Sequence, residues 1–107
     1  MTDPNEAVNY IYLNAPLFSQ AKAERVRLEE YRKSKKALLM CQSDAKTAAE
    51  REQYAYSHQE YIDLLTDLAT AVAKEELLRL QIDAAKLRVE IYRTESANNR
   101  YLDKVTQ

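Results

Sequence analysis

The stretch from Ser57 to Gln107 contains neither glycine nor proline, so no residue in it obliges a helix to end. Apolar residues recur there in steps of four and three, the pattern of a helix that packs along other helices. They are Tyr61, Leu64, Leu68, Ala71, Leu78, Ile82, Ala85, Val89 and Tyr92. One unbroken helix of this length would extend ~70 Å. The rest of so short a chain cannot cover it, and the stretch therefore predicts self-association.

The composition of the whole chain favours long helices in a single domain over residues 1–107. Glycine is absent, and 46% of the residues are hydrophobic, which argues against disorder. Phosphate-binding loops and nucleophile elbows need glycine at backbone positions that other residues avoid. We therefore expect a protein that is not an enzyme, with no cofactor and no small-molecule substrate.

The charge balance and the chain start indicate a cytoplasmic protein. The net charge is −1, so any electrostatic binding must come from a local patch. The first ten residues, MTDPNEAVNY, lack the basic and apolar regions of a signal peptide, and no apolar run reaches the ~20 residues of a membrane span. A single cysteine excludes an internal disulfide. We expect no membrane partner.

Two prolines divide the first part of the chain. Pro4 follows capping residues and predicts the start of a short helix over residues 4–13. Pro16 disfavours the helical conformation at Ala15, so we expect a break near Asn14 and a second helix over residues 16–43. The second helix carries an imperfect apolar stripe of Leu17, Ala21, Leu28, Tyr31 and Leu38.

Two capping boxes follow one another between the long segments. Thr47 with Glu50, and Ser57 with Glu60, each place a hydroxyl three residues before a carboxylate. They predict a short connecting helix over residues 48–56 and a long helix over residues 58–103.

The predicted fold class is all-α, a long antiparallel helical hairpin of the coiled-coil kind, with a short N-terminal helix and a short connecting helix, in an oligomer. The hairpin would bring Lys35 towards Asp67 and Arg27 towards Glu75, and Leu38 close to Leu64.

The residues that could carry catalysis are isolated from one another. His58 is the only histidine and lies at a helix start, where we expect a structural role. Cys41 follows Leu-Leu-Met near a helix end, so we expect it to be buried and inert. Asp63 and Asp67 share a helix face, but no Glu-x-x-His motif accompanies them. We predict no catalytic residue and no metal site.

The strongest local charge signal runs from Lys22 to Lys36, with seven basic and three acidic residues. The side chains that fall on roughly one side of this helix are typical of a phosphate-facing stripe. The candidate contacts to nucleic acid or to an acidic partner are Lys22, Arg25, Arg32, Lys33 and Lys36. A solvated face with mixed charges is the alternative, because exposed helices commonly carry such pairs.

The eight tyrosines suggest an interface, because tyrosine is enriched where proteins meet. The long helix has little of its own chain to pack on after about Ala85. The predicted oligomer interface consists of Val89, Ile91, Tyr92 and Tyr101. The alternative is that Tyr92 and Tyr101 pack against Tyr10, Tyr12 and Phe18 in an internal core.

The segments AERVRLEEYRKSKKALLM and KTAAEREQYAYSHQEY, with the long helix after them, resemble small, glycine-poor helical accessory proteins of tailed bacteriophages and prophages. The resemblance implies a bacterial host cytoplasm and sometimes a part in DNA recombination or replication. The leading hypothesis is a non-enzymatic accessory protein that binds DNA or its processing machinery through the basic helix face. The alternative is an adaptor or inhibitor of a host protein.

Overall fold

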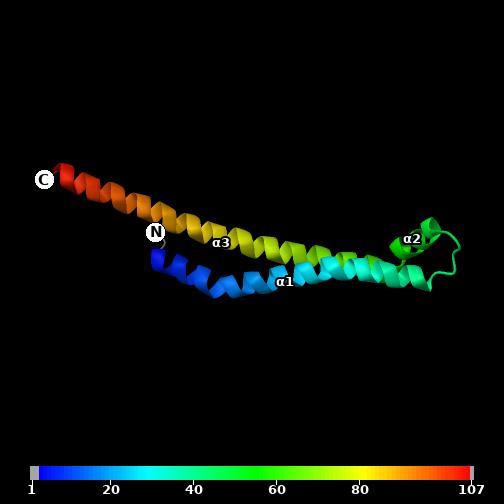
Figure 1. Ribbon diagram of the computed structural model, residues 1–107. Helices are drawn as coiled ribbons and strands as arrows, with labels where there is room; N and C mark the ends of the chain where they lie inside the picture. The colour runs from blue at the N-terminus through cyan, green and yellow to red at the C-terminus, as the bar shows by residue number, and fades with distance from the viewer. Residues whose placement is uncertain (1–2, 107) are drawn as a thin grey trace. The chain divides into compact units, whose positions relative to one another are not determined.

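A computed structural model describes residues 3–106 as three helices (Figure 1). They are α1 (Pro4–Gln42), α2 (Ala48–Ser57) and α3 (Gln59–Thr106), and no strand occurs in this part of the chain. The all-α prediction is confirmed. Contacts within the chain form two units, one with residues up to Ser19 and from Glu76 onward, the other with Gln20–Glu75. Both α1 and α3 contribute residues to each unit.

Helix α1 does not end before Pro16, so the predicted break near Asn14 and the separate N-terminal helix are wrong. Pro16 lies inside the continuous helix. A proline removes one hydrogen bond to the carbonyl four residues earlier, and the turns on either side can still form. The side chain of Asn14 supports this region, because its Nδ2 donates to the carbonyl of Tyr10 at 2.8 Å. Ala7, one of the most buried residues of α1, anchors the helix before the proline.

The connecting helix follows the first predicted capping box. Thr47 has an extended backbone, and its Oγ1 accepts a hydrogen bond from the Glu50 amide at 3.2 Å. This bond satisfies one of the amides that a helix start leaves without an intrahelical partner. Helix α2 begins at the residue that the sequence predicts and ends one residue later, at Ser57.

The second predicted capping box does not form. The Ser57 hydroxyl donates backwards to the carbonyl of Gln53 at 2.7 Å and thus belongs to the end of α2. His58 takes the capping role instead, since its Nδ1 accepts from the Glu60 amide at 3.1 Å. Helix α3 accordingly begins at Gln59, and it continues to Thr106, beyond the predicted end at residue 103.

The core of the unit 20–75 consists of two small clusters. Leu28 packs with Leu64 and Ala71, and the fully buried Leu39 packs with Ala55 and Tyr61. The apolar stripe that the sequence predicts along α1 is only partly correct. Ala21 and Leu28 are buried, but the other members, Leu17, Tyr31 and Leu38, are exposed.

Charged residues occupy positions along the packed face of α1 that the apolar stripe was expected to fill. Lys35 Nζ lies 2.6 Å from Glu60, where Asp67 was the predicted partner. Arg25, and not Arg27, pairs with Glu75 at 2.6 Å. Long side chains of this kind pack their methylene stems while their charges find partners at the rim. For this reason, the spacing of apolar residues alone does not identify Arg25 and Lys35 as members of the packed face.

The other unit packs the start of α1 on the middle of α3. Ala7, Ile82 and Ala85 are buried there. The Tyr10 hydroxyl donates to Gln81 Oε1 at 3.1 Å, which fixes the alignment of the two segments at their exposed edge.

Candidate functional site

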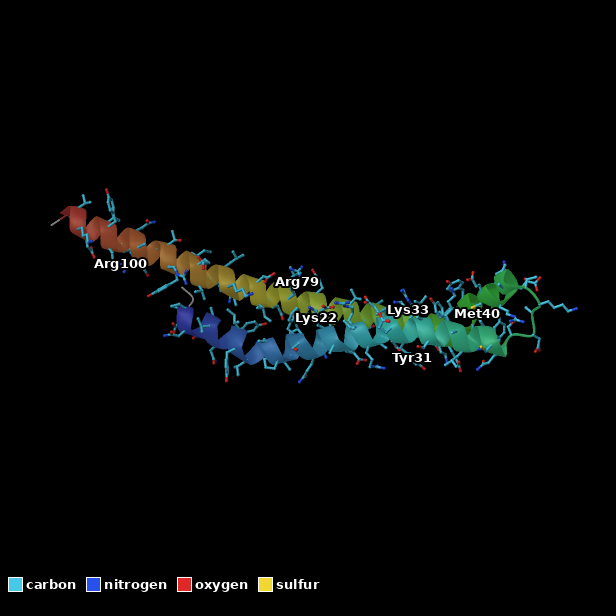
Figure 2. All side chains as sticks on the ribbon, viewed as in Figure 1. Lys22, Tyr31, Lys33, Met40, Arg79 and Arg100 are labelled. Atoms are coloured by element: carbon cyan, nitrogen blue, oxygen red, sulfur yellow. The ribbon has the colours of Figure 1, made fainter. Side chains whose placement is uncertain are left out.

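The predicted basic contact residues all lie on α1, in the unit 20–75. Lys22 and Lys33 are exposed, and both are labelled in Figure 2. The other three, Arg25, Arg32 and Lys36, are half-buried. The charge that this face offers to a ligand depends on the carboxylates around each cation.

Arg25 is engaged within its own unit. Its Nε and Nη2 donate to the Glu75 carboxylate at 2.6 and 3.0 Å, and its Nη1 donates to Glu29 at 3.0 Å. The hydrogen bonds with Glu75 and then Glu29 raise the pKa of Arg25. A two-point arginine–carboxylate contact is among the more specific ionic geometries. Arg25 therefore joins α1 to α3, and a ligand would have to displace this contact.

Lys36 and Lys33 also have carboxylate partners. Lys36 lies 3.4 Å from Glu52 on α2 and 4.7 Å from the centre of the Tyr56 ring. A hydrogen bond with Tyr56 is the main cause that raises the pKa of Lys36; burial opposes it, and a hydrogen bond with Glu52 adds to it. Lys33 pairs with Glu30 at 3.3 Å, and both side chains are exposed. Among residues 3–106, Lys22 and Arg32 are the two predicted contacts to which no ion pair is assigned.

The candidate catalytic side chains, His58 and Cys41, differ in their surroundings. The Nδ1 atom of His58 accepts the Glu60 amide, and its ring lies edge-on to Tyr54 with centroids 5.6 Å apart. Cys41 is exposed, so the expectation of a buried thiol is wrong. Its position on an outward face of α1, beside buried Leu39 and half-buried Met40, explains the exposure. Within residues 3–106, no three potential ligands gather as a metal site would require.

The four residues predicted to form an oligomer interface lie on two different faces of α3. Val89 and Tyr92 continue the heptad steps of the buried Ile82 and Ala85, the inner stripe. Val89 is half-buried and Tyr92 is 39% exposed. Ile91 and Tyr101 lie on another face and are 57% and 67% exposed.

That other face carries a second heptad stripe. We call it the outer stripe, with apolar members Leu80, Ala84, Leu87, Ile91, Tyr101 and Val105. Its steps of four and three continue through Thr94 and Asn98. At 3.6 residues per turn, the outer stripe lies on roughly the opposite side of α3 from the inner stripe. Each of its large apolar residues is more than half exposed. The outer stripe can also be recognised in the sequence, because its residues follow the same steps of four and three as the inner stripe.

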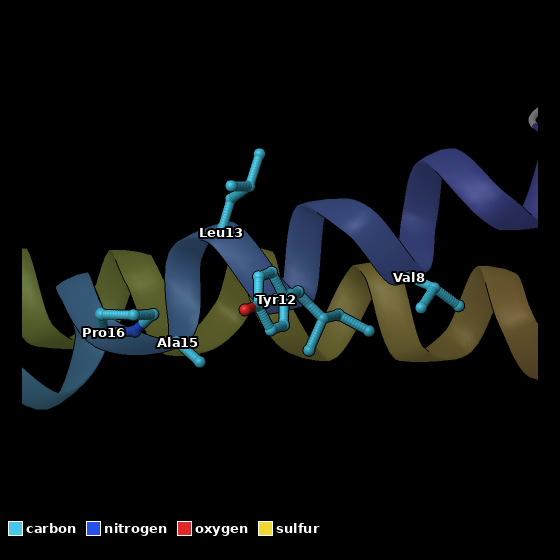
Figure 3. Close-up of a pocket in the computed structure, with 6 residues that line it drawn as sticks. Val8, Tyr12, Leu13, Ala15 and Pro16 are labelled. Atoms are coloured by element: carbon cyan, nitrogen blue, oxygen red, sulfur yellow. The ribbon is translucent and has the colours of Figure 1, made fainter.

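A further apolar surface lies on α1 near Pro16. Val8, Tyr12 and Pro16, with their neighbours, line an open groove of about 630 Å³ (Figure 3). Val8, Tyr12 and Leu13 are each more than half exposed. The groove is formed by one helix, so it offers a shallow surface and no enclosed site.

Within residues 3–106, none of the helices has both the length and the apolar character needed to cross a bilayer. No protein-family model, curated protein or solved structure matches this chain.

Proposed function

We propose that this chain is a non-enzymatic protein that works by binding a helix of another protein chain along the outer stripe of α3. One observation carries the proposal, the exposure of large apolar side chains at heptad spacing on the side of α3 opposite the buried Ile82 and Ala85. Burying such a stripe removes apolar surface from water, which is the main driving force for helix association. Isolated exposed leucines are ordinary on protein surfaces, but several large apolar side chains exposed on one helix face are typical of an interaction site.

We also infer that α1 and α3 pair in an antiparallel hairpin within each unit. In the unit 20–75, Arg25 pairs with Glu75 and Lys35 pairs with Glu60. Partner numbers fall along α3 as they rise along α1, which supports this direction. The pairing occupies the inner stripe and leaves the outer stripe for a partner.

The proposed function can be tested by comparing three tagged baits in a nuclease-treated lysate of cells that express the protein. The baits are the wild type, the outer-stripe variant Leu87→Gln/Ile91→Gln, and the control Leu38→Gln, whose side chain is similarly exposed but lies outside the stripe. Glutamine is a good helix former, so neither variant weakens α3 or α1 itself. We expect the wild type and the control to retain a stoichiometric protein that the outer-stripe variant loses. Equal retention by all three baits would refute the proposal.

Nucleic-acid binding through the basic face remains a second candidate function, supported by Lys22 and Arg32. Neither has an assigned ion pair within residues 3–106, and Lys22 is exposed. The charge balance of the unit 20–75 weakens this candidate, because acidic residues of α3 and α2 pair with Arg25 and Lys36. A bacteriophage setting likewise remains a proposal.

A DNA titration at two salt concentrations tests the second candidate. If Lys22 and Arg32 contact phosphates, Lys22→Glu/Arg32→Glu should weaken binding and reduce the salt slope by about 2. The control Arg100→Glu changes an exposed cation of α3 in the other unit; Arg100 is labelled in Figure 2. Absence of binding at low salt, or equal loss in both variants, would eliminate the basic face as a nucleic-acid site.

A further inference from the structure

We propose that the partner of the outer stripe is a second copy of this chain, aligned antiparallel over residues 80–105. This inference rests on the proposed function and names its partner. In the alignment, Ile91 of one copy faces Thr94 of the other, and Ala84 faces Tyr101. Both contacts occur twice, because the two copies are related by a two-fold axis.

Side-chain size supports this alignment. The smallest apolar member of the outer stripe, Ala84, meets the largest, Tyr101, and the exposed Leu80 meets the exposed Val105. Alternation of large and small side chains across an interface lets the two surfaces fill the space between them. The hollow beside Tyr101, lined also by Ala97 and Lys104, offers room for such packing.

The charges that flank the outer stripe support the same alignment. Arg88 of one copy lies beside Glu95 of the other, and Asp83 lies beside Lys104. In an antiparallel pair of helices, residues at equivalent flanking positions face one another, and opposite charges there set the orientation. Each of these attractive pairs is formed twice, and the alignment brings no two like charges together. Glu90, the remaining flanking acid in this segment, faces Ala97.

The flanking residues are available for these contacts. Arg88, Glu95 and Lys104 are exposed, and no ion pair is assigned to them within residues 3–106. Asp83 pairs with Arg79 at 3.1 Å, but its side chain is still 46% exposed and can accept a second cation.

A parallel, in-register pair is the competing arrangement. It would place Asn98 against Asn98, which favours parallel dimers, and Asp83 beside Arg88. It would also place Glu90 beside Glu95 on both sides of the pair, and Tyr101 against Tyr101. The antiparallel alignment avoids the acidic repulsion and places Asn98 against Leu87.

The first arm of the test is the solution mass of the full chain, by sedimentation or light scattering over a range of concentrations. We expect twice the chain mass of 12.4 kDa for the wild type and for the Leu38→Gln control. Leu87→Gln/Ile91→Gln should raise the dissociation constant by about 100-fold, since both copies lose two apolar side chains. A strict monomer, or a dimer that this variant does not weaken, would overturn the inference.

The second arm determines the direction with single-cysteine variants in a Cys41→Ser background, because Cys41 is exposed. Leu87→Cys and Asn98→Cys face one another in the antiparallel alignment, and two copies of either position lie about 16 Å apart along the axis. A disulfide needs Cα atoms within about 7 Å. We expect a cross-link in the mixture of the two variants and none in either variant alone. Rapid cross-linking of Asn98→Cys by itself would overturn the inference in favour of the parallel pair.

The two proposals fail in different ways. If the chain is a monomer but the lysate experiment recovers a different protein that depends on Leu87 and Ile91, the second copy is excluded and the proposed function stands. If neither a copy nor another protein depends on these residues, both proposals are refuted.

Discussion

Replacement of Leu39 by alanine should destabilise the protein far more than the same replacement at the adjacent Leu38. The Leu39 side chain is fully buried against Ala55 and Tyr61, and Leu38 is 55% exposed. The two residues are consecutive in α1 and undergo the same chemical change. Differences in helix propensity and in the unfolded chain therefore cancel when the two variants are compared.

The expected size follows from the side-chain atoms that leave the core. Removing three carbons from a buried leucine forfeits about 2.4 kcal/mol of transfer free energy, at ~0.8 kcal/mol for each carbon. The cavity that remains beside Tyr61 adds to this, and measured Leu→Ala changes in cores reach about 2 to 5 kcal/mol. We expect about 3 kcal/mol for Leu39→Ala. Leu38→Ala should lower the free energy of unfolding by less than about 1 kcal/mol, because half of its side chain is already hydrated.

Urea denaturation followed by circular dichroism measures both values at one protein concentration, so that any association affects both variants alike. A loss of 3 kcal/mol in a chain of this size also lowers the melting temperature by roughly 12 to 24 °C. Equal destabilisation by the two replacements, or a larger effect at Leu38, would refute the assignment of Leu39 to the core. It would instead favour the stripe first expected from the sequence.

Three further changes test local features of the fold. Pro16→Ala restores an amide donor inside α1 and should raise the free energy of unfolding by about 1 to 3 kcal/mol in urea denaturation; a loss of stability would mean that the proline is required. Thr47→Ala removes the α2 cap and should cost about 1 kcal/mol, whereas Thr66→Ala, inside α3 and away from its start, should change the denaturation midpoint little. The Lys35 hydrogen bond lowers the pKa of Glu60, so its contribution is present above the unfolded pKa of ~4.3 and disappears as the pH falls through the lower folded value. Glu60→Gln should therefore flatten the acid side of the stability profile, and an unchanged profile would contradict the pairing.

The sequence predicts the helices well because their signals are local. Thr47 and Glu50 indicate the start of α2, and the absence of glycine and proline after Ser57 predicts the long α3. The break at Pro16 is a failure of the same local reasoning. A proline removes one hydrogen bond, but the packing of residues on both sides, such as Ala7 and Ala21, keeps the helix continuous.

The packed face of α1 could not be read from apolar spacing alone. Arg25 and Lys35 lie along it and find Glu75 and Glu60, which are distant in the sequence. For the same reason, the sequence overstates how many cations between Lys22 and Lys36 are available to a ligand, since the acids that neutralise Arg25 and Lys36 belong to other helices. The spacing of the outer stripe can be read from the sequence alone. The structure is needed to show that the inner stripe is the buried one and that the outer stripe remains exposed.

The end of α3 links the second copy to the stability of the helix itself. After Tyr92, Ser96 is the only residue up to Thr106 that is not exposed, so the inner stripe stabilises this segment little. A helical segment this short is marginal in water without packing, and contacts along the outer stripe are what a second copy would supply. Hydrogen exchange of the amides from residue 93 to residue 106 should therefore slow as the protein concentration rises, and by a larger factor than exchange near Leu39, which has a core of its own. Concentration-independent protection in the wild type, or protection that persists in Leu87→Gln/Ile91→Gln, would show that the segment is stabilised in some other way than by a second copy.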